Sequence, residues 1–460
     1  MSLLLQAKRA VERIPEPLGR HFARVPFGLR LGPAYGAAAA GLARFEAMGA
    51  DERRAWIFDR VRRAVVQAER ENDFYRDFFA RHGFHSGQLR GFDDLARIPI
   101  VTKADLRQAP LAERSTPQRG RLLLNSGGTS GEPLDFYVDR HAFAREWAHM
   151  LHIWARLGYR PTHTRLTFRG RNFGAAPLRY NAVHNEWLVN TYHPDRDQVA
   201  RAVLELAARR QISFLHGYPS AIHEFARICA ERHPALAESL RQSLGGVLFG
   251  SEYPAPVYRD RVEAVFGAPT LSWYGHSEMA VLAHEDGEAF RYRPLHSYGW
   301  VEAVPDGAGG HRLVGTSYYN RASPFIRYDT GDRVEPVERD GLLAEFRVAA
   351  GRVGEFLADA SGNRIPLTAF IFGRHHPVFG VARFVQVYQP APGHATLVVV
   401  LPPGVDAASV NWASAFDLAG VEVEFRVAVR SEPVRTVAGK VPLVVRELDD
   451  PGVPLVAAGV

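Results

Sequence analysis

Cysteine is almost absent from this 460-residue chain, which contains a single residue of that type, Cys229. One thiol excludes an internal disulfide framework and any zinc site built from several cysteines. Cys229 lies at helical spacing from Ile222, Phe225 and Ala226, and this pattern predicts a buried structural thiol.

Long apolar runs are missing as well. Residues 1–8 contain no apolar core of the length found in a signal peptide, and the small-residue run 37–42 is too short to cross a bilayer. We therefore expect a cytoplasmic protein without a membrane partner.

Blocks of like charge are also absent. The chain has 56 lysine and arginine residues against 50 aspartate and glutamate residues, a formal net charge of +6, and no run of five or more like charges. Because the positive charge is spread along the chain, it gives little support for a nucleic-acid partner and suits anionic small molecules equally well.

The length exceeds what one hydrophobic core usually supports, so several domains are expected. Residues 1–95 are predicted to form a helical region packed on a large domain. Within it, the apolar spacing of 51–67 indicates an amphipathic helix with Asp51 as its N-cap. Thr102 is predicted to cap a second, short helix.

Residues 96–351 alternate short apolar runs with helical patterns, which predicts an α/β domain with layered, largely parallel sheets. Strands are expected at 165–168, 213–216, 246–249, 271–274 and 312–316, and helices at 198–209, 219–231 and 255–266. Residues 352–447 predict a small α+β domain, with strands at 384–388, 396–401 and 422–429 and a helix at 409–418. A tail follows at 448–460.

The most distinctive stretch of the sequence is 124–133, in which three glycines and three hydroxyl residues fall between Ser126 and Gly131. Glycines let backbone N–H groups approach a ligand closely, so the stretch can cradle phosphate oxygens. It is not a Walker A loop, because the Gly-Lys-[Ser/Thr] ending is missing. The other interpretation is an ordinary hairpin loop between a strand ending at Leu124 and a strand at 134–138.

Four further polar stretches follow in order: Gly250-Ser251-Glu252, Tyr274-Gly275-His276-Ser277-Glu278, Arg327–Asp332 and Arg435–Lys440. Each alone is compatible with a polar turn. Together with the glycine-rich loop they resemble the adenylate-forming (AMP-forming) acyl synthetase superfamily, and in particular its phenylacetate–CoA ligase-like branch. The resemblance covers about residues 70–447 and includes the segments 74–79 and 95–106.

This resemblance implies a large domain that binds ATP and the acyl substrate and a small, mobile C-terminal domain that carries a catalytic lysine, Lys440. The β- and γ-phosphates of ATP would be held by the loop residues Ser126, Gly127, Gly128, Thr129, Ser130 and Gly131. Adenine and ribose would be contacted by Gly250, Ser251, Glu252, Tyr274, Gly275, Asp332 and Arg352. Glu278 would be both a catalytic residue and the Mg²⁺ ligand.

The acyl pocket is expected near the strand ends, with His216, Tyr218, Trp273 and His276 as candidates. Two arginines, Arg169 and Arg171, flank a glycine after another strand and either hold an anionic group of the substrate or are simply solvated; we favour solvation. No spacing among His184, His375 and His376 supports a metal site. The pair 375–376, near Arg374, either contacts a thiol or amine acceptor or lies in a surface loop; we favour the surface loop.

Two positions depart from the family pattern. Glu132 stands where many members carry lysine, and an acid there does not help to bind a triphosphate, so we expect it to point away. Gly354 stands at the hinge position, where aspartate or lysine is common, although glycine can still supply the backbone rotation of a hinge.

The leading hypothesis is therefore a two-step ligase that converts a carboxylic acid and ATP into an acyl-adenylate and then transfers the acyl group to coenzyme A. An alternative within the same class is amide formation with an amine or amino acid. A nucleotide-binding scaffold without turnover belongs to a different class, and the retained Glu278, Asp332 and Lys440 argue against it. Relatives suggest a homodimer in some cases.

Overall fold

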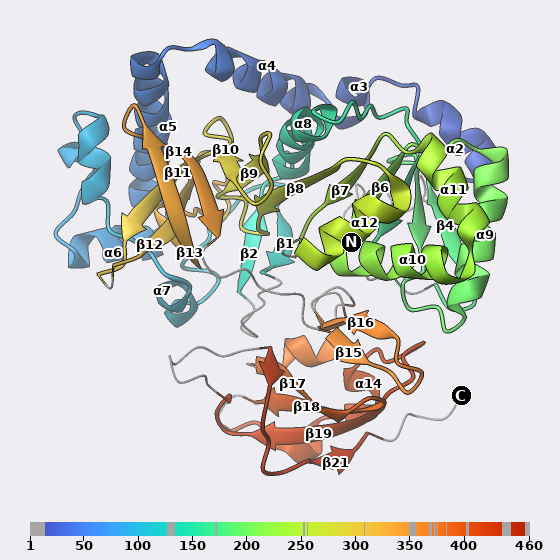
Figure 1. The fold of residues 1–460 in the computed structure, drawn as a ribbon. Coiled ribbons are helices and arrows are strands. Elements are labelled where there is room, and N and C mark those ends of the chain that lie inside the picture. Colours follow the sequence, from blue (N-terminus) through green and yellow to red (C-terminus); the bar gives the residue numbers. More distant parts are fainter. Residues whose placement is uncertain are drawn as a thin grey trace.

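The computed structural model describes residues 14–126, 134–169, 171, 173–251, 254, 256–307, 309–348, 356–367, 370–371, 374, 376–382, 384–401, 404–434 and 443–455. Its first part is helical (Figure 1). The helical elements are α2 (Glu16–Phe22), α3 (Phe27–Leu31), α4 (Pro33–Ala47), α5 (Ala50–Glu71), α6 (Asp73–Arg81), η1 (Ser86–Gln88), η2 (Phe92–Arg97) and α7 (Lys103–Gln108).

Two predicted helix caps had different outcomes. Thr102 caps α7 as predicted, because its Oγ1 accepts the Asp105 N–H at 3.2 Å. The prediction for Asp51 is wrong: α5 begins after Gly49, whose N–H donates to the Glu52 carboxylate at 3.0 Å. Asp51 instead lies in the first turn, where an acid is stabilised by the helix dipole.

The helical part packs against the strand that carries one of the polar motifs. The buried faces of α5 and α6 form one apolar cluster with Phe325 and Ile326. The Tyr75 hydroxyl donates to the Pro324 carbonyl at 2.9 Å and accepts the Ile326 N–H at 3.0 Å. These contacts fix the chain just before Tyr328.

A twelve-stranded sheet forms the centre of the molecule, in the order β11-β12-β13-β14-β10-β9-β8-β7-β6-β3-β5-β4. Its strands are β3 (Arg165–Phe168), β4 (Leu178–Asn181), β5 (Glu186–Val189), β6 (Phe214–Gly217), β7 (Gly246–Phe249), β8 (Thr270–Gly275), β9 (Leu282–Glu285), β10 (Tyr292–Pro294), β11 (Gly299–Pro305), β12 (His311–Ser317), β13 (Tyr328–Arg339) and β14 (Leu342–Val348).

The α/β class is confirmed, but the expectation of largely parallel sheets holds for only part of this sheet. Parallel pairing is confined to the run β5-β3-β6-β7-β8, and the remaining neighbours pair antiparallel. The physical reason is the connections: helices link β5, β6, β7 and β8. In the described residues the strands from β8 to β14 are linked by loops without a helix, and most of them pair antiparallel with the next strand along the chain.

Helices cover both faces of the parallel run (Figure 1). On β7, Val247 and Phe249 pack in one apolar cluster and Leu248 packs in another. The first cluster includes α9 (Arg196–Arg209), α10 (Pro219–Arg232), α11 (Pro234–Ser243) and α12 (Pro256–Phe266), and it holds the fully buried Cys229, as predicted. The second includes α8 (Ala142–Ala155). Because these strands are packed on both faces, the side chains at their ends are held in fixed positions.

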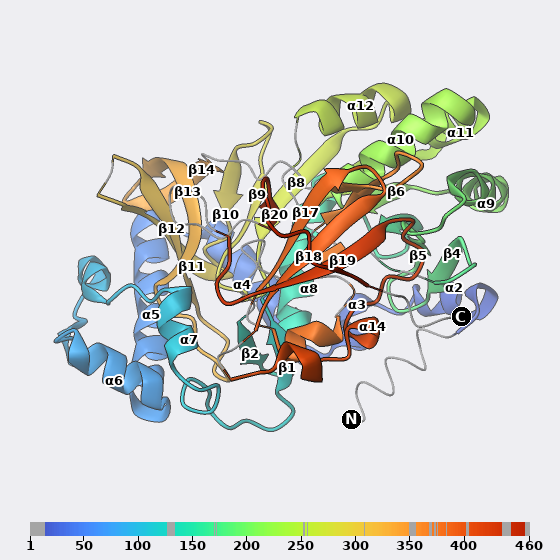
Figure 2. The ribbon, with the colours of Figure 1, turned by 90° about the horizontal axis from the view of Figure 1, so that it is seen from below.

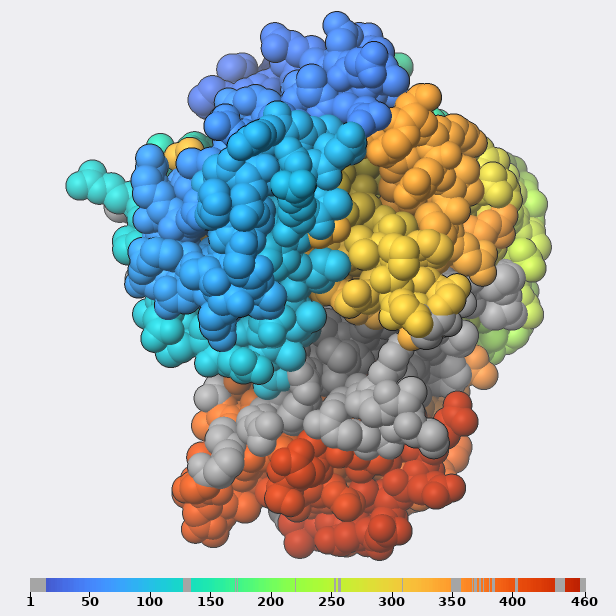
Figure 3. All heavy atoms as spheres, turned by 90° about the vertical axis from the view of Figure 1, so that its left-hand side faces the viewer, coloured from blue at the N-terminus to red at the C-terminus, as the bar shows by residue number. Residues whose placement is uncertain are grey.

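The C-terminal part has its own sheet, β20-β17-β18-β19-β21, beside the pair β15 (Phe356–Ala358) and β16 (Arg364–Pro366). Its strands are β17 (Phe384–Ala391), β18 (His394–Val400), β19 (Glu424–Arg430), β20 (Val444–Val445) and β21 (Val453–Pro454). It lies below the large sheet (Figures 1 and 3). The predicted boundary at 351–352 is outside the described residues, so the domain division stays a prediction.

The helix predicted at 409–418 is wrong in extent. Only α14 (Trp412–Ala415) is helical there, preceded by η4 (Ala407–Ser409) and with η3 (Pro377–Gly380) packed nearby. The backbone turns extended at Phe416, which is buried, and the Asp417 N–H donates to the His376 ring at 2.9 Å. Tertiary contacts therefore override the local helical pattern.

The C-terminal part meets the large sheet near the carboxyl end of β5. The Arg374 guanidinium lies 3.7 Å from the centre of the Tyr192 ring, which also contacts Phe370. Seen from below, the C-terminal sheet crosses the large sheet in projection (Figure 2). Among the described residues, no helix combines the length and apolarity needed to cross a membrane.

Candidate functional site

The glycine-rich stretch joins β1 (Leu122–Asn125) and β2 (Asp135–Val138), which form an antiparallel hairpin. Ser126 closes the hairpin: its N–H donates to the Leu134 carbonyl and its Oγ accepts the Leu134 N–H, both at 2.9 Å. The hairpin interpretation is thus correct for the flanking strands. Gly127, Gly128, Thr129, Ser130, Gly131 and Glu132 lie outside the described residues, so the phosphate cradle stays a prediction.

The carboxyl ends of β6, β7 and β8 bring several predicted residues to one edge of the sheet. Gly250 follows β7, and a Cβ placed on it would lie 2.1 Å from the Trp273 ring, so the glycine allows close packing. The next residue, Ser251, has a left-handed backbone with φ of 71°. A non-glycine residue in that conformation is strained, which is typical of functional loops. Ligands of open α/β sheets bind at this edge.

Gly217 ends β6 and has no room for a side chain. Its φ is +140°, and an added Cβ would lie 2.1 Å from the Phe168 carbonyl oxygen. We expect Gly217→Ala to lower the free energy of unfolding by roughly 3 kcal/mol, because backbone strain and a backbone clash add. Urea denaturation measures this loss.

The control for this substitution is Gly83→Ala. Gly83 also has a left-handed φ, +65°, but nothing lies within 4 Å of the place that an added Cβ would take. The Gly83→Ala substitution is expected to lower the free energy of unfolding by only about 1 kcal/mol. Equal losses in the two variants would contradict the close packing assigned to Gly217.

His216 is a buried, neutral ring at this edge. Its Nδ1 donates to the Leu248 carbonyl at 3.2 Å and its Nε2 accepts from Arg169 at 3.0 Å. Burial and the charges of Arg169 and Arg165 hold its pKa well below the usual range. The ring stacks on Trp273, with centroids 5.3 Å apart. The exposed Arg169 is thus bound to the protein as well as solvated, whereas Arg171 is simply exposed.

Tyr218, His184 and His376 lie away from the residues at this edge of the sheet. Tyr218 packs with the layer of α9–α12, on the opposite face from Trp273. His184 stacks on Trp147 at 4.5 Å. His376 is 2% exposed, so its prediction as a surface-loop residue is wrong: its ring contacts the Phe370 carbonyl. The described residues contain no group of three or more potential metal ligands.

Glu278 is a buried carboxylate with two hydrogen-bond donors. Its Oε1 accepts from the Tyr328 hydroxyl at 3.0 Å and its Oε2 from His276 Nδ1 at 3.1 Å. Burial alone would raise its pKa, but the His276 hydrogen bond and the charges of His276 and Lys103 lower the pKa to about 2. Glu278 is therefore ionised throughout the neutral range.

This depressed pKa predicts a pH-dependent stability term. The pKa of Glu278 rises from about 2 in the folded chain to its ordinary value of 4.5 on unfolding. The stabilisation is therefore complete above about pH 4.5 and is lost as pH falls toward 2. We expect the difference in unfolding free energy between wild type and Glu278→Gln to shrink across that window. A difference that grows as pH falls would contradict an ionised Glu278.

Tyr274 and Asp332, which are 58 positions apart in the sequence, meet directly. The Tyr274 hydroxyl donates to Asp332 Oδ2 at 2.6 Å. The ring of Tyr274 stands edge-on to Phe346, with centroids 5.5 Å apart, and this contact holds its orientation. A further contact links β13, which carries Asp332, to the N-terminal part of the chain: the Asp329 N–H donates to the Val101 carbonyl at 2.9 Å.

Three residues near the site were not assigned from the sequence. Tyr328 was only part of a motif, Lys103 lies at the start of α7 beside the Val101–Tyr328 bridge, and Glu146 is on α8. Glu146 accepts a hydrogen bond from Tyr298, and burial raises its pKa despite that bond and the charge of His276. The elements predicted from the sequence did not include a helix at α8, so Glu146 was not expected to face inward.

Besides the loop residues, the predicted residues Glu252, Arg352 and Lys440 lie outside the described part of the chain, as does Gly354. Gly275 is the last residue of β8, directly before His276. The structure thus brings together Glu278, His276, Tyr274 and Asp332, and beside them His216 and Trp273 with Gly250.

The chain is similar to several known proteins. No family model matches the chain. Protein CapK from Staphylococcus aureus is 23% identical over 303 residues, which are 63% of this chain and 65% of that protein. Phenylacetate-coenzyme A ligase from Pseudomonas putida is 28% identical over 303 residues, covering 62% of this chain and 67% of the ligase.

A solved structure of 2-hydroxyisobutyryl-CoA ligase, in complex with 2-HIB-AMP and CoA in the thioesterification state, covers 88% of this chain and 92% of its own. The TM-score is 0.54 at 20% identity. The fold is that of the adenylate-forming ligases. The predicted resemblance to the adenylate-forming acyl-CoA ligase superfamily is thereby confirmed. The match to CapK spans slightly less than two thirds of that protein.

Proposed function

We propose that this protein is an AMP-forming ligase. It joins a carboxylic acid to ATP as an acyl-adenylate with release of pyrophosphate, and it then transfers the acyl group to coenzyme A. The observation that carries the proposal is the Tyr274–Asp332 hydrogen bond of 2.6 Å beside the buried, ionised Glu278. Such a pairing suits a nucleoside with an adjacent phosphate chain.

Each part of the nucleotide would be bound by residues of suitable chemistry. Asp332 offers two acceptor oxygens, which suit the vicinal hydroxyls of ribose, and the Tyr274 ring suits stacking on adenine. Arg352 would lie beside the ribose, and the backbone at Gly250, Ser251, Glu252 and Gly275 would line the base. The loop residues 126–131 would hold the β- and γ-phosphates and later the leaving pyrophosphate.

Mg²⁺ fits the donor set at Glu278. This ion is commonly held by one or two carboxylates together with water and substrate phosphates, so a single carboxylate suffices. Glu278 is ionised, and each of its oxygens has a second lone pair beyond the hydrogen bond that it accepts. When bound, the ion offsets negative charge on the phosphates. Glu278 would hold it, with His276 and Tyr328 fixing the carboxylate orientation.

The acid would lie near His216, Trp273 and His276, with Tyr218 as a more distant candidate. Its carboxylate must approach the α-phosphate, and the two groups repel each other. The Lys440 ammonium would offset this repulsion and the charge that develops on the α-phosphoryl oxygens. Acid-dependent ATP–pyrophosphate exchange with a panel of carboxylic acids tests the first step; its absence with every acid would overturn the proposal.

Coenzyme A is the proposed acceptor because curated relatives are named as phenylacetate-coenzyme A ligases. We expect CoA to accelerate AMP formation in the presence of the preferred acid. A panel of amines and amino acids is the comparison. Faster AMP formation with an amine than with CoA would move the acceptor to the amide-forming class.

Asp332→Ala is expected to raise the dissociation constant of ATP by about 10- to 100-fold, because a hydrogen bond to a charged group contributes about 1.5–3 kcal/mol. Isothermal titration calorimetry measures this change. Tyr274→Phe is the comparison variant: it keeps the ring and removes only the hydroxyl that donates to Asp332. Its loss should be smaller. An unchanged ATP affinity in Asp332→Ala would remove Asp332 from ribose binding.

A further inference from the structure

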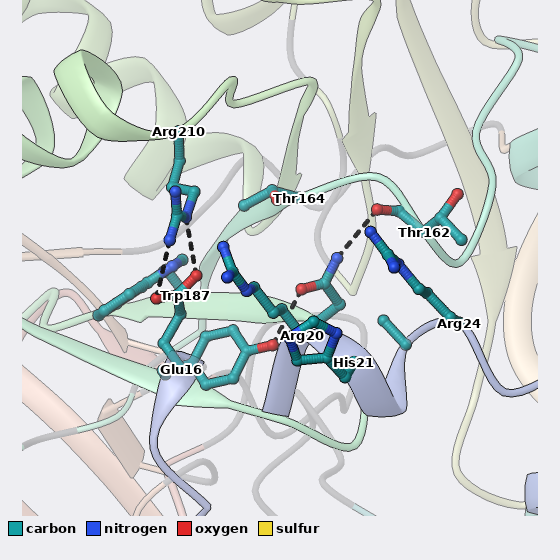
Figure 4. Close-up of a pocket in the computed structure, with 11 residues that line it drawn as sticks. Glu16, Arg20, His21, Arg24, Thr162, Thr164, Trp187 and Arg210 are labelled. Atoms are coloured by element: carbon teal, nitrogen blue, oxygen red, sulfur yellow. Dashed lines mark hydrogen bonds and ion pairs between the residues drawn. The ribbon is translucent and has the colours of Figure 1, made fainter. Parts of the chain in front are cut away.

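A basic pocket lies at the opposite edge of the sheet from the candidate site. Its volume is about 410 Å³, and it is lined by Glu16, Arg20, His21, Ala23, Arg24, Thr162, Thr164, Tyr180, Asn185, Trp187 and Arg210 (Figure 4). Thr164 directly precedes β3, whereas His216 and Arg169 lie at the carboxyl ends of the strands. The pocket is therefore separate from the proposed adenylation residues.

The wall formed by α2 is held firmly against β4. A Cβ added to Gly19 would lie 2.6 Å from the Tyr180 ring, so the helix packs on the strand through this glycine. Tyr180 in turn donates to Asn185 at 2.9 Å, and Asn185 donates to the Thr162 carbonyl at 3.0 Å. Tyr180 and Asn185 are both buried. The floor of the pocket is thus a connected, ordered surface.

The arginines of the pocket are not equally paired. Arg210 forms an ion pair with Glu16 at 2.8 Å, which uses the one carboxylate in the lining. The side chains of Arg20 and Arg24 are exposed and make no ion pair or hydrogen bond within the part of the chain that the structure describes. In Figure 4 the Arg20 side chain extends from α2 and the Arg24 side chain from the chain just after it, and both extend toward the threonines. With three arginines against one carboxylate, the lining carries an excess of positive charge.

Arg20 lies on α2, and Arg24 lies two residues beyond the end of that helix. An anion in the pocket would offset the positive charge of both guanidinium groups. Arginine forks bind phosphate oxygens in pairs, and the Thr162 and Thr164 hydroxyls are additional donors.

We propose that this pocket binds the phosphate group of a phosphorylated small molecule, with Arg20 and Arg24 as its main contacts. The volume lies within the range of about 300–1,000 Å³ typical of small-molecule pockets, which exceeds the need of a free phosphate ion. The organic part of the ligand lies against Trp187 and the Glu16–Arg210 pair. This site is independent of the proposed ligase activity.

Calorimetry at low ionic strength tests the proposal with ribose 5-phosphate, inorganic phosphate and ribose as probes. We expect ribose 5-phosphate to bind more tightly than inorganic phosphate, and ribose not to bind. In Arg20→Ala/Arg24→Ala the affinity should fall at least roughly tenfold. The matched control is Arg62→Ala/Arg90→Ala, which removes the same charge from exposed positions and should leave the affinity unchanged.

Equal affinity in the two double variants, or no binding of ribose 5-phosphate by the wild type, would overturn the proposal. Inorganic phosphate binding as tightly as ribose 5-phosphate would overturn the organic part of the assignment. A second measurement needs no variant: ribose 5-phosphate should protect Arg20 and Arg24 of the wild type from phenylglyoxal, as read by peptide mass spectrometry. Unprotected arginines would also count against the site. The ATP–pyrophosphate exchange assay tests the ligase proposal separately, so neither outcome bears on that proposal.

Discussion

Glu278→Gln is expected to lower the rate of acid-dependent ATP–pyrophosphate exchange by about 10²- to 10³-fold. Loss of one preorganised electrostatic contact in a buried site typically costs this much. The carboxylate is 6% exposed, accepts hydrogen bonds from Tyr328 and His276, and has a pKa lowered to about 2. Glutamine keeps the shape and removes the negative charge, so the effect isolates the charge that we assign to Mg²⁺ binding.

The comparison variant is Glu285→Gln. Glu285 is another buried carboxylate, but it binds Arg259 at 2.6 Å and the Ser272 N–H at 2.8 Å, within the sheet. Its loss should lower the midpoint of thermal unfolding while the exchange rate of folded protein stays close to wild type. An equal loss of exchange in both variants, or a normal rate in Glu278→Gln, would contradict the role of Glu278. Raising the Mg²⁺ concentration should partly restore exchange in Glu278→Gln only.

Lys440→Ala is expected to abolish acid-dependent pyrophosphate exchange while ATP still binds. Lys8, Lys103 and Lys440 are the lysines of this arginine-rich chain. An ammonium is a compact point charge on a flexible stem, which suits the role that we propose for Lys440 at the α-phosphate. The removal of such a donor typically costs about 3–4 kcal/mol of transition-state stabilisation.

Lys440→Arg separates charge from shape: it keeps a positive charge in a larger, planar group and should restore only part of the rate. Calorimetry must show the same ATP affinity in Lys440→Ala as in the wild type. Undiminished exchange in Lys440→Ala would remove the lysine from the adenylation step. If Lys440→Ala bound ATP more weakly but showed normal exchange at saturating ATP, Lys440 would contribute to ATP binding alone.

Much of the fold follows from local patterns in the sequence. The apolar runs at 165–168 and 246–249 are the strands β3 and β7 with the bounds predicted for them. These strands are buried on both faces and flanked by amphipathic helices, so their signal is strong. The helix at 409–418 failed because burial of Phe416 and a hydrogen bond to His376 turn the chain, and neither contact is visible locally.

The motifs of the candidate site could be predicted from the sequence, but the contacts between their side chains could not. The order of the motifs pointed to Tyr274, Glu278 and Asp332. The hydrogen bonds that connect Tyr274 to Asp332 and Tyr328 to Glu278 join distant strands and depend on sheet order. For the same reason the sequence did not reveal Lys103, whose charge acts on Glu278 through the packing of α7 on β13.

The most direct test of the account is the fate of an oxygen atom of the acid. If the carboxylate attacks the α-phosphate, one carboxylate oxygen stays on AMP when the acyl group is transferred. With the preferred acid labelled with oxygen-18, mass spectrometry after a single turnover should find one labelled oxygen in AMP and none in pyrophosphate. Unlabelled AMP, or label in a phosphate released from the γ-position, would contradict the account.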